Sequence, residues 1–166
     1  MDDARNAGPF SGYAPGQEES LRGHVVLMGA FLSICGTFAA WLRRSGRRLP
    51  ERFGAGDLVV LSVATHKAAR LVAKDRVTSP LRAPFTRFEH DDGPGEVAES
   101  PRGSGLRRAI GELVSCPYCL GVWIASGFIF GLIAAPRATR AIASMLTVVS
   151  GASVLQIAYK KAEDAL

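Results

Sequence analysis

The stretch Cys116-Pro-Tyr-Cys-Leu-Gly-Val-Trp-Ile-Ala-Ser-Gly-Phe-Ile-Phe-Gly-Leu-Ile-Ala-Ala135 decides the fold of this chain. It joins a closely spaced cysteine pair to an apolar run, and no residue between Pro117 and Ala135 carries a charge. A helix of this length rises about 28 Å, which is close to the thickness of the hydrocarbon core of a bilayer. The sequence therefore predicts a transmembrane helix over 117–135.

Apolar and basic segments alternate along the rest of the chain. Its 166 residues include 20 Lys and Arg against 15 Asp and Glu, which gives a net charge of +5. In a soluble protein this surplus would indicate nucleic acid binding, but beside apolar spans it indicates membrane topology and anionic lipid headgroups. We therefore expect a membrane protein with no nucleic acid partner.

Two further apolar blocks are long enough to cross a bilayer. One covers 23–42 and ends near Trp41, an aromatic residue suited to the membrane interface, and the other covers 141–159 and is followed by Lys160 and Lys161. Residues 1–22 are polar, contain Gly and Pro, and show no helix or strand period, so they are expected to be a disordered tail. The predicted fold is an all-α integral membrane protein with three transmembrane helices.

Residues 43–116 are expected to form a basic cytoplasmic loop. The arginine-rich segment 43–52 favours the cytoplasmic side, which places the N-terminus outside and the C-terminus in the cytoplasm. The apolar piece that starts at Leu58 is interrupted by Lys67 and Arg70, so 57–73 is predicted to be an interfacial or re-entrant amphipathic helix. A full span over the same residues remains an alternative.

Pro80 and Pro84 predict an irregular backbone over 74–88, because proline interrupts regular helix. Arginines and phenylalanines alternate in this loop, a pattern that suits either phospholipid headgroups or packing onto the protein's own helices. The acidic segment 89–100 is expected to be a solvated loop. The candidate residues for binding anionic phospholipid headgroups or a partner are Lys67, Arg70, Lys74, Arg76, Arg82 and Arg87.

The cysteine pair Cys116 and Cys119 supports three readings. Cys-Pro-Tyr-Cys matches the active-site tetrapeptide of glutaredoxins, where a helix N-terminus activates the first thiol, but the strand and helix pattern of that fold is absent. Two thiolates could instead supply half of a zinc site, with His66 among the candidates for a further ligand. The third reading is a reduced, structural pair at the entry of the helix.

Small residues mark a packing stripe on the segment 117–135. Gly127 and Gly131 stand four residues apart on one helix face, where a second helix can approach closely. We expect packing within the chain, and a homodimer through these glycines is the alternative.

Three blocks of the sequence, in order, resemble a bacterial membrane protein family, domain of unknown function 1360. They run from Ala64 to Phe88, from Gly95 to Val97, and from Gly105 to Ile124. The resemblance covers roughly residues 57 to 160 and implies a small multi-pass protein of the bacterial cytoplasmic membrane. It implies no reaction and no catalytic residues.

Two function classes follow from these observations. The first is a non-enzymatic membrane protein whose basic cytoplasmic loop binds anionic lipid or a partner, and we favour it. The second is a membrane-bound enzyme, which would use either thiol redox chemistry at Cys116 and Cys119 or chemistry on a phospholipid. The phospholipid reaction would use the set Lys74, Asp75, Arg76 and Arg82.

Overall fold

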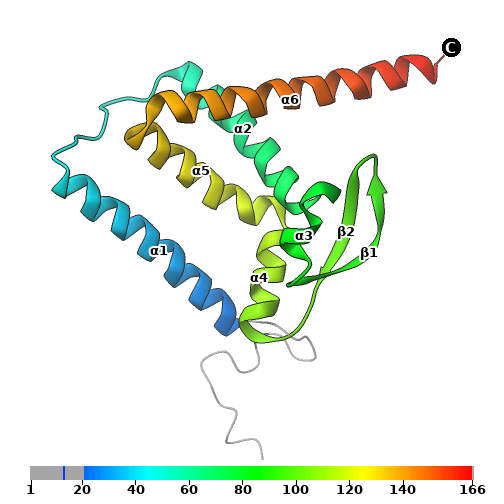
Figure 1. The fold of residues 1–166 in the computed structure, drawn as a ribbon, viewed down its shortest axis with the longest axis horizontal. Coiled ribbons are helices and arrows are strands. Elements are labelled where there is room, and N and C mark those ends of the chain that lie inside the picture. The colour runs from blue at the N-terminus through cyan, green and yellow to red at the C-terminus, as the bar shows by residue number, and fades with distance from the viewer. Residues whose placement is uncertain (1–12, 14–20, 166) are drawn as a thin grey trace, which may run out of the picture.

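The computed structural model describes residues 13 and 21–165, and the expected tail 1–22 lies almost entirely outside this range. Five long or medium helices carry the fold: α1 (Leu21–Arg44), α2 (Ala55–Ala73), α4 (Gly105–Ser115), α5 (Pro117–Ala134) and α6 (Pro136–Glu163). Three of them, α1, α5 and α6, are long and apolar enough to cross a membrane by length and composition. Figure 1 shows α1, α2 and α5 as a group of inclined helices, with α6 lying across one end.

Helix α2 is the centre of the packing. It makes most of its contacts with α5 and α6, and it supplies residues to both apolar clusters among the described residues. Leu61 and Ala64 pack with Leu132 of α5 and Ala143 of α6, while nearer its C-terminus Ala69 and Ala73 pack with Leu120 of α5. α2 therefore packs against α5 and α6 along one side, while Leu58 and Val59 on another side are exposed.

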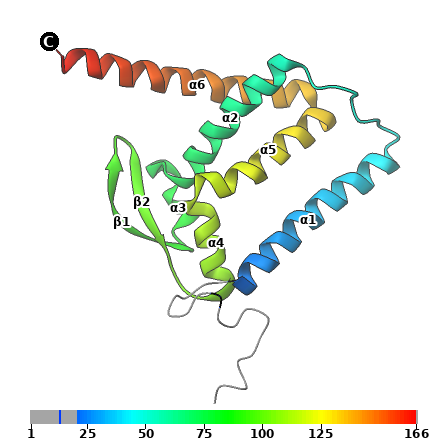
Figure 2. The same cartoon turned by 180° about the vertical axis from the view of Figure 1, so that it is seen from behind.

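Helices α1 and α5 run in the same direction (Figure 2), and aromatic side chains make contacts between them. The rings of Phe31 and Trp123 are 5.1 Å apart, and those of Phe38 and Phe130 are 4.1 Å apart. Beyond the end of α1, Arg47 Nη1 donates a hydrogen bond of 2.9 Å to the carbonyl oxygen of Ala134 at the end of α5. Residues that are further along α1 therefore contact residues that are further along α5, as expected for two parallel helices.

This parallel arrangement differs from the one that the predicted three-span topology implies, in which α1 and α5 run in opposite directions. In that topology the segment 43–52 and the turn after α5 lie on opposite sides of the membrane. The Arg47–Ala134 hydrogen bond joins them, and the ion pair between Arg140 and Asp57 of α2, 2.7 Å, lies at the same end. The chain must therefore travel back along the length of the bundle between α1 and α5, and α2 is the segment that does so.

A β-hairpin occupies the segment predicted as a loop, so the all-α expectation is wrong here. Strands β1 (Thr86–Gly93) and β2 (Glu96–Pro101) pair antiparallel, and a short 3-10 helix, η2 (Arg76–Thr78), and the four-residue helix α3 (Ser79–Arg82) lead into them. The turn uses Gly93 at φ 130° and Gly95 at φ 79°, a region that glycine enters without steric cost. Pro80 stands in the first turn of α3, where its missing N–H is tolerated.

Candidate functional site

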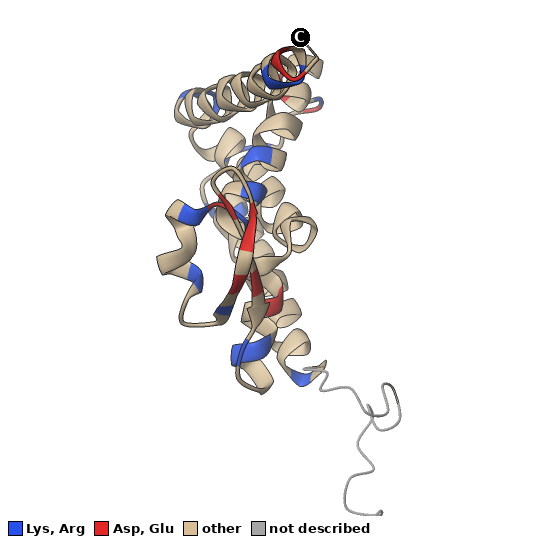
Figure 3. Ribbon diagram, turned by 90° about the vertical axis from the view of Figure 1, so that its right-hand side faces the viewer, with Lys and Arg blue, Asp and Glu red and all other residues tan. Residues whose placement is uncertain are grey.

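The hairpin is held against the end of α2 by three ion pairs, which we call the clasp. Arg70 Nε donates to Glu96 Oε1 at 3.2 Å, Lys74 Nζ lies 3.6 Å from Asp92 Oδ2, and Arg76 pairs with Asp91. Figure 3 shows the acidic strands facing basic segments of the chain. These side chains are partly exposed, so each pair contributes only about 0.2–1 kcal/mol.

A fourth pair, Arg82 with Glu99, is buried beneath the clasp. Both of its hydrogen bonds, Nε to Oε2 and Nη2 to Oε1, measure 2.9 Å, and the side chains are 1% and 5% exposed. Arg82 also donates to the carbonyl oxygens of Val72 and Asp75, while Ser79 and Thr86 donate to the carboxylate. Every polar atom of the pair therefore has an internal partner.

Two opposing effects determine the pKa of the Glu99 carboxyl. Burial raises its pKa, but hydrogen bonds from Arg82, Thr86 and Ser79 together outweigh burial, so the pKa lies below the ordinary glutamate value. The ionised form is thus the form that the fold stabilises.

These contacts narrow the set of basic residues predicted to bind lipid or a partner. Arg70, Lys74 and Arg76 are engaged by hairpin carboxylates, and Arg82 is buried away from any headgroup. Lys67 Nζ lies 3.4 Å from Ser153 Oγ of α6. Arg87 alone of the set has no polar partner among the described residues. In the set Lys74, Asp75, Arg76 and Arg82, two members pair with hairpin carboxylates and Arg82 is buried, and chemistry on a phospholipid at this set remains a prediction.

A different basic surface, which sequence reasoning missed, surrounds the start of α4. We call it the basic rim. Gly23 of α1 fits closely against Gly105 and Ala109 of α4, which brings the first turns of these helices together. Arg102 N–H and Arg107 Nε anchor the neighbouring backbone by donating to the carbonyl oxygens of Phe85 and Pro84. The rim consists of Arg22, Arg87, Arg102, Arg107 and Arg108.

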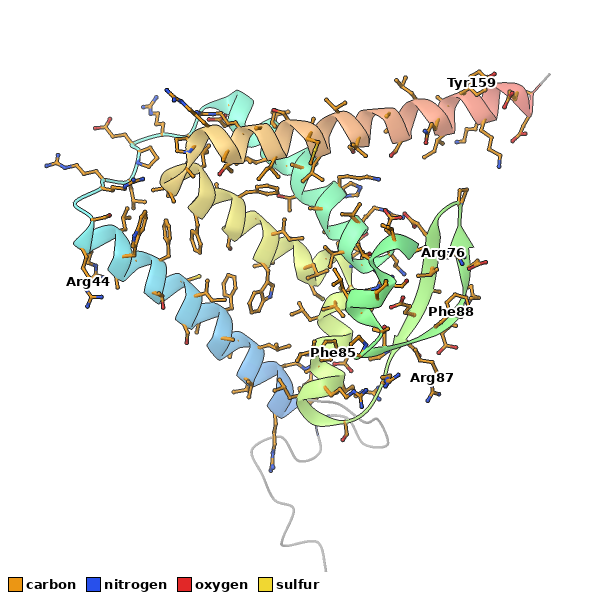
Figure 4. All side chains as sticks on the ribbon, in the orientation of Figure 1. Arg44, Arg76, Phe85, Arg87, Phe88 and Tyr159 are labelled. Atoms are coloured by element: carbon orange, nitrogen blue, oxygen red, sulfur yellow. The ribbon has the colours of Figure 1, made fainter. Side chains whose placement is uncertain are left out.

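Figure 4 places Arg87 near the hairpin base and Arg44 at the far end of α1. The rim therefore lies at the opposite end of α1 from the arginines that follow that helix. The signal for the rim was present as Arg102, Arg107 and Arg108 in the sequence, but their proximity to Arg22 and Arg87 depends on the α1–α4 contact and on the hairpin.

The cysteine pair begins helix α5, as the sequence predicts. Pro117 occupies its first turn, and the backbone N–H of Cys119 donates to Cys116 Sγ at 3.2 Å, so Cys116 caps the helix. Both thiols are free. Within the described range, no three His, Cys, Asp or Glu side chains gather closely enough to hold a metal ion. A zinc site using Cys116, Cys119 or His66 would need ligands from elsewhere, and zinc binding remains a prediction.

The two glycines of the small-residue stripe have different surroundings. A Cβ atom at Gly131 would lie 2.7 Å from Thr139 Oγ1 of α6, so this glycine permits close packing within the chain. Around Gly127 no atom of the described structure lies within reach of a Cβ. A homodimer contact therefore remains a prediction for Gly127, while Gly131 is already covered by α6.

The sequence comparisons identify the family. Residues 60–159, which span most of α2 through most of α6, match the family model described as protein of unknown function (DUF1360). The chain belongs to this family. It is also 33% identical over 107 residues to the protein named sporulation protein YjcA of Bacillus subtilis (strain 168), covering 63% of this chain and 91% of that protein. No solved structure matches, and α1 lies outside the residues matched by the family model.

Proposed function

We propose that this DUF1360 protein is a four-helix membrane protein whose basic rim binds anionic phospholipid headgroups at one bilayer surface. The observation that carries the proposal is the position of the rim at the first turn of α1. A helix of this length and apolarity that crosses a bilayer has its ends at headgroup depth. The rim arginines would then lie beside lipid phosphates.

The partners of the charged residues on α2 support its role as a membrane-crossing segment. Asp57 pairs with Arg140, Lys67 contacts Ser153, and Arg70 pairs with Glu96. Charged groups within membrane segments face the bundle and pair with one another in this way. The buried apolar side of α2 and these pairings fit a fourth helix between α5 and α6.

Four crossings change the expected orientation. The side that holds the N-terminus, hairpin and C-terminus contains eleven Lys and Arg outside α2, against seven on the other side, so positive-inside bias favours a cytoplasmic N-terminus. The eleven are Arg5, Arg22, Lys74, Arg76, Arg82, Arg87, Arg102, Arg107, Arg108, Lys160 and Lys161. The seven are Arg43, Arg44, Arg47, Arg48, Arg52, Arg137 and Arg140.

Electrostatics favours the rim over the clasp as the headgroup site. A basic side chain near an anionic membrane surface contributes about 1 kcal/mol to the attraction. The clasp arginines already face carboxylates, whereas Arg87, Arg102 and Arg107 have no carboxylate partner among the described residues. These three arginines can thus bind phosphate without first breaking an ion pair, whereas Arg108, another rim residue on α4, pairs with Glu112.

The experiment is native mass spectrometry of the full chain released from nanodiscs that contain phosphatidylglycerol and phosphatidylcholine. We expect the wild type to retain phosphatidylglycerol preferentially and the Arg102→Ser/Arg107→Ser variant to lose most of this preference. Lys160→Ser/Lys161→Ser removes the same charge from the last turn of α6 and is the matched control, expected to change retention much less. Equal retention by the rim variant and the wild type would overturn the proposal.

A further inference from the structure

A cavity of about 300 Å³ lies between α1, α4 and α5. Its size is at the lower end of the range for small-molecule sites. The α1 wall includes Met28 and Phe31, and the α5 wall includes Cys119, Val122 and Trp123. The cavity thus has a free thiol on a mainly apolar wall.

One end of the cavity is polar. His24 of α1 and Glu112 of α4 both line it, and His24 Nε2 lies 3.0 Å from Glu112 Oε2. Arg108 Nε donates to the other oxygen of the same carboxylate at 3.0 Å. A polar ligand group at this end would therefore meet an imidazole and a carboxylate that are already held in place.

The opposite end is aromatic and apolar. Phe31 and Trp123 meet edge to face across the gap between α1 and α5, with ring centroids 5.1 Å apart. Such edges and faces suit a planar ring ligand. Because α1 and α5 are both apolar enough to cross a membrane, molecules that reach the cavity from the bilayer must be lipid-soluble.

The second thiol stands next to the cavity. Cys116 precedes α5, and its sulfur lies 3.2 Å from the backbone nitrogen of Cys119. A Cys-x-x-Cys pair at a helix N-terminus is the usual arrangement of a dithiol that closes reversibly to a disulfide. The cavity and its surroundings thus combine a thiol pair, a polar end and an aromatic, apolar end.

From this combination we infer that the cavity binds a membrane quinone and that Cys116 and Cys119 reduce it. An acyl chain would fill the apolar part but would use neither the thiol pair nor the His24–Glu112 pair. A quinone uses all three features, because its ring is planar, its oxygens accept hydrogen bonds, and it accepts two electrons.

The chemistry balances within the two reactants. The sulfur of Cys119 adds to the quinone ring and forms a carbon–sulfur bond while its proton passes to one quinone oxygen. The sulfur of Cys116 then attacks Cys119 Sγ, which forms the disulfide and breaks the carbon–sulfur bond, and the electron pair of that bond leaves with the ring as the Cys116 proton passes to the other oxygen. The two thiol protons end on the two oxygens, so one dithiol and one quinone become one disulfide and one quinol.

The test uses the reduced full chain in detergent with decyl-ubiquinone as the probe. We expect one quinone to be reduced per protein and two thiols to be lost together. Cys119→Ser should abolish quinone reduction, while Cys35→Ser, which removes the thiol of α1, should leave it unchanged. Val122→Trp should fill the cavity and slow the reaction at least tenfold.

Two measurements separate loss of the site from loss of the fold. The small-molecule oxidant diamide should oxidise the pair in Val122→Trp as it does in the wild type. In a Trp41→Phe background, quinone should quench the fluorescence of Trp123 even when Cys119 is serine, because binding precedes reaction. The inference is overturned if the wild type binds quinone without losing thiols, if Val122→Trp reacts at the wild-type rate, or if diamide but not quinone oxidises the pair.

Discussion

Arg82 and Glu99 form a two-pronged ion pair that is almost completely shielded from solvent, with both hydrogen bonds at 2.9 Å. The pair joins α3 to β2 and, through Val72, to the end of α2. A buried pair of this kind contributes little net stability compared with a well-packed apolar pair. Removal of one partner, however, leaves the other charge buried without a counter-charge. Its main effect is to specify how the hairpin docks.

Replacement of one member of this pair should therefore be severe. Glu99→Leu leaves the Arg82 guanidinium buried without its carboxylate and is expected to destabilise the protein by about 3–5 kcal/mol. The double variant Arg82→Met/Glu99→Leu should recover a large part of that loss. Thermal unfolding in detergent measures both, and a double variant no more stable than Glu99→Leu would contradict this account.

The pair should also make stability depend on pH. Because the pKa of Glu99 is lower in the folded state, its ionisation contributes stability above the unfolded-state glutamate pKa of about 4.3, and the contribution is lost as pH falls through the lower folded value. The stability difference between wild type and Glu99→Gln should therefore shrink in acid below this range. Denaturation at several pH values tests this, and a difference that grows on acidification would contradict the sign.

Gly111 should not tolerate a side chain. A Cβ atom there would lie 2.5 Å from the carbonyl oxygen of Phe85 and 3.2 Å from the Cα atom of Pro101, both backbone atoms. Gly111→Ala is expected to destabilise by about 1–3 kcal/mol despite the better helix propensity of alanine. Gly121→Ala on α5 is the control, since no described atom lies within 4 Å of its Cβ position. Equal melting temperatures for the two variants would refute the close-contact argument.

The parallel order of α1 and α5 makes a labelling prediction. In a chain whose three native cysteines are serine, Arg48→Cys and Arg137→Cys should react with a membrane-impermeant maleimide from one side, and Arg102→Cys from the other. The three-span topology predicts instead that positions 48 and 102 share a side. Labelling of intact cells and of inverted vesicles distinguishes the two arrangements.

Long apolar runs and the polar or proline residues beside them indicated where three long helices lie. Arg43 and Arg44 close the first run and Pro117 begins α5, whereas α6 begins at Pro136, before the predicted start at residue 141. The path of α2 was harder to predict, since Lys67 and Arg70 appear incompatible with a membrane until Ser153 and Glu96 are found beside them. A sequence pattern read over neighbouring residues does not reveal partners that are this distant in the chain.

The hairpin escaped prediction for a related reason. Its strands are polar, with Thr86 and Val97 as their only buried residues, so the usual alternation of apolar and polar side chains is weak. Gly93 and Gly95 were the available signal, because two glycines around a proline mark a turn between strands. The cavity could not be inferred at all, because it depends on the spacing that Phe31 and Trp123 impose between α1 and α5.

The ion pairs that dock the hairpin also bear on the order of folding. Their partners are separated by 15, 17 and 26 residues for Arg76–Asp91, Arg82–Glu99 and Arg70–Glu96. Loops of this length close at a modest entropic cost, and contacts between near neighbours in sequence form quickly. The end of α2 and the hairpin can therefore assemble as soon as residue 101 has been synthesised. Helices α5 and α6, which follow in the sequence, then pack against a part of the protein that is already folded.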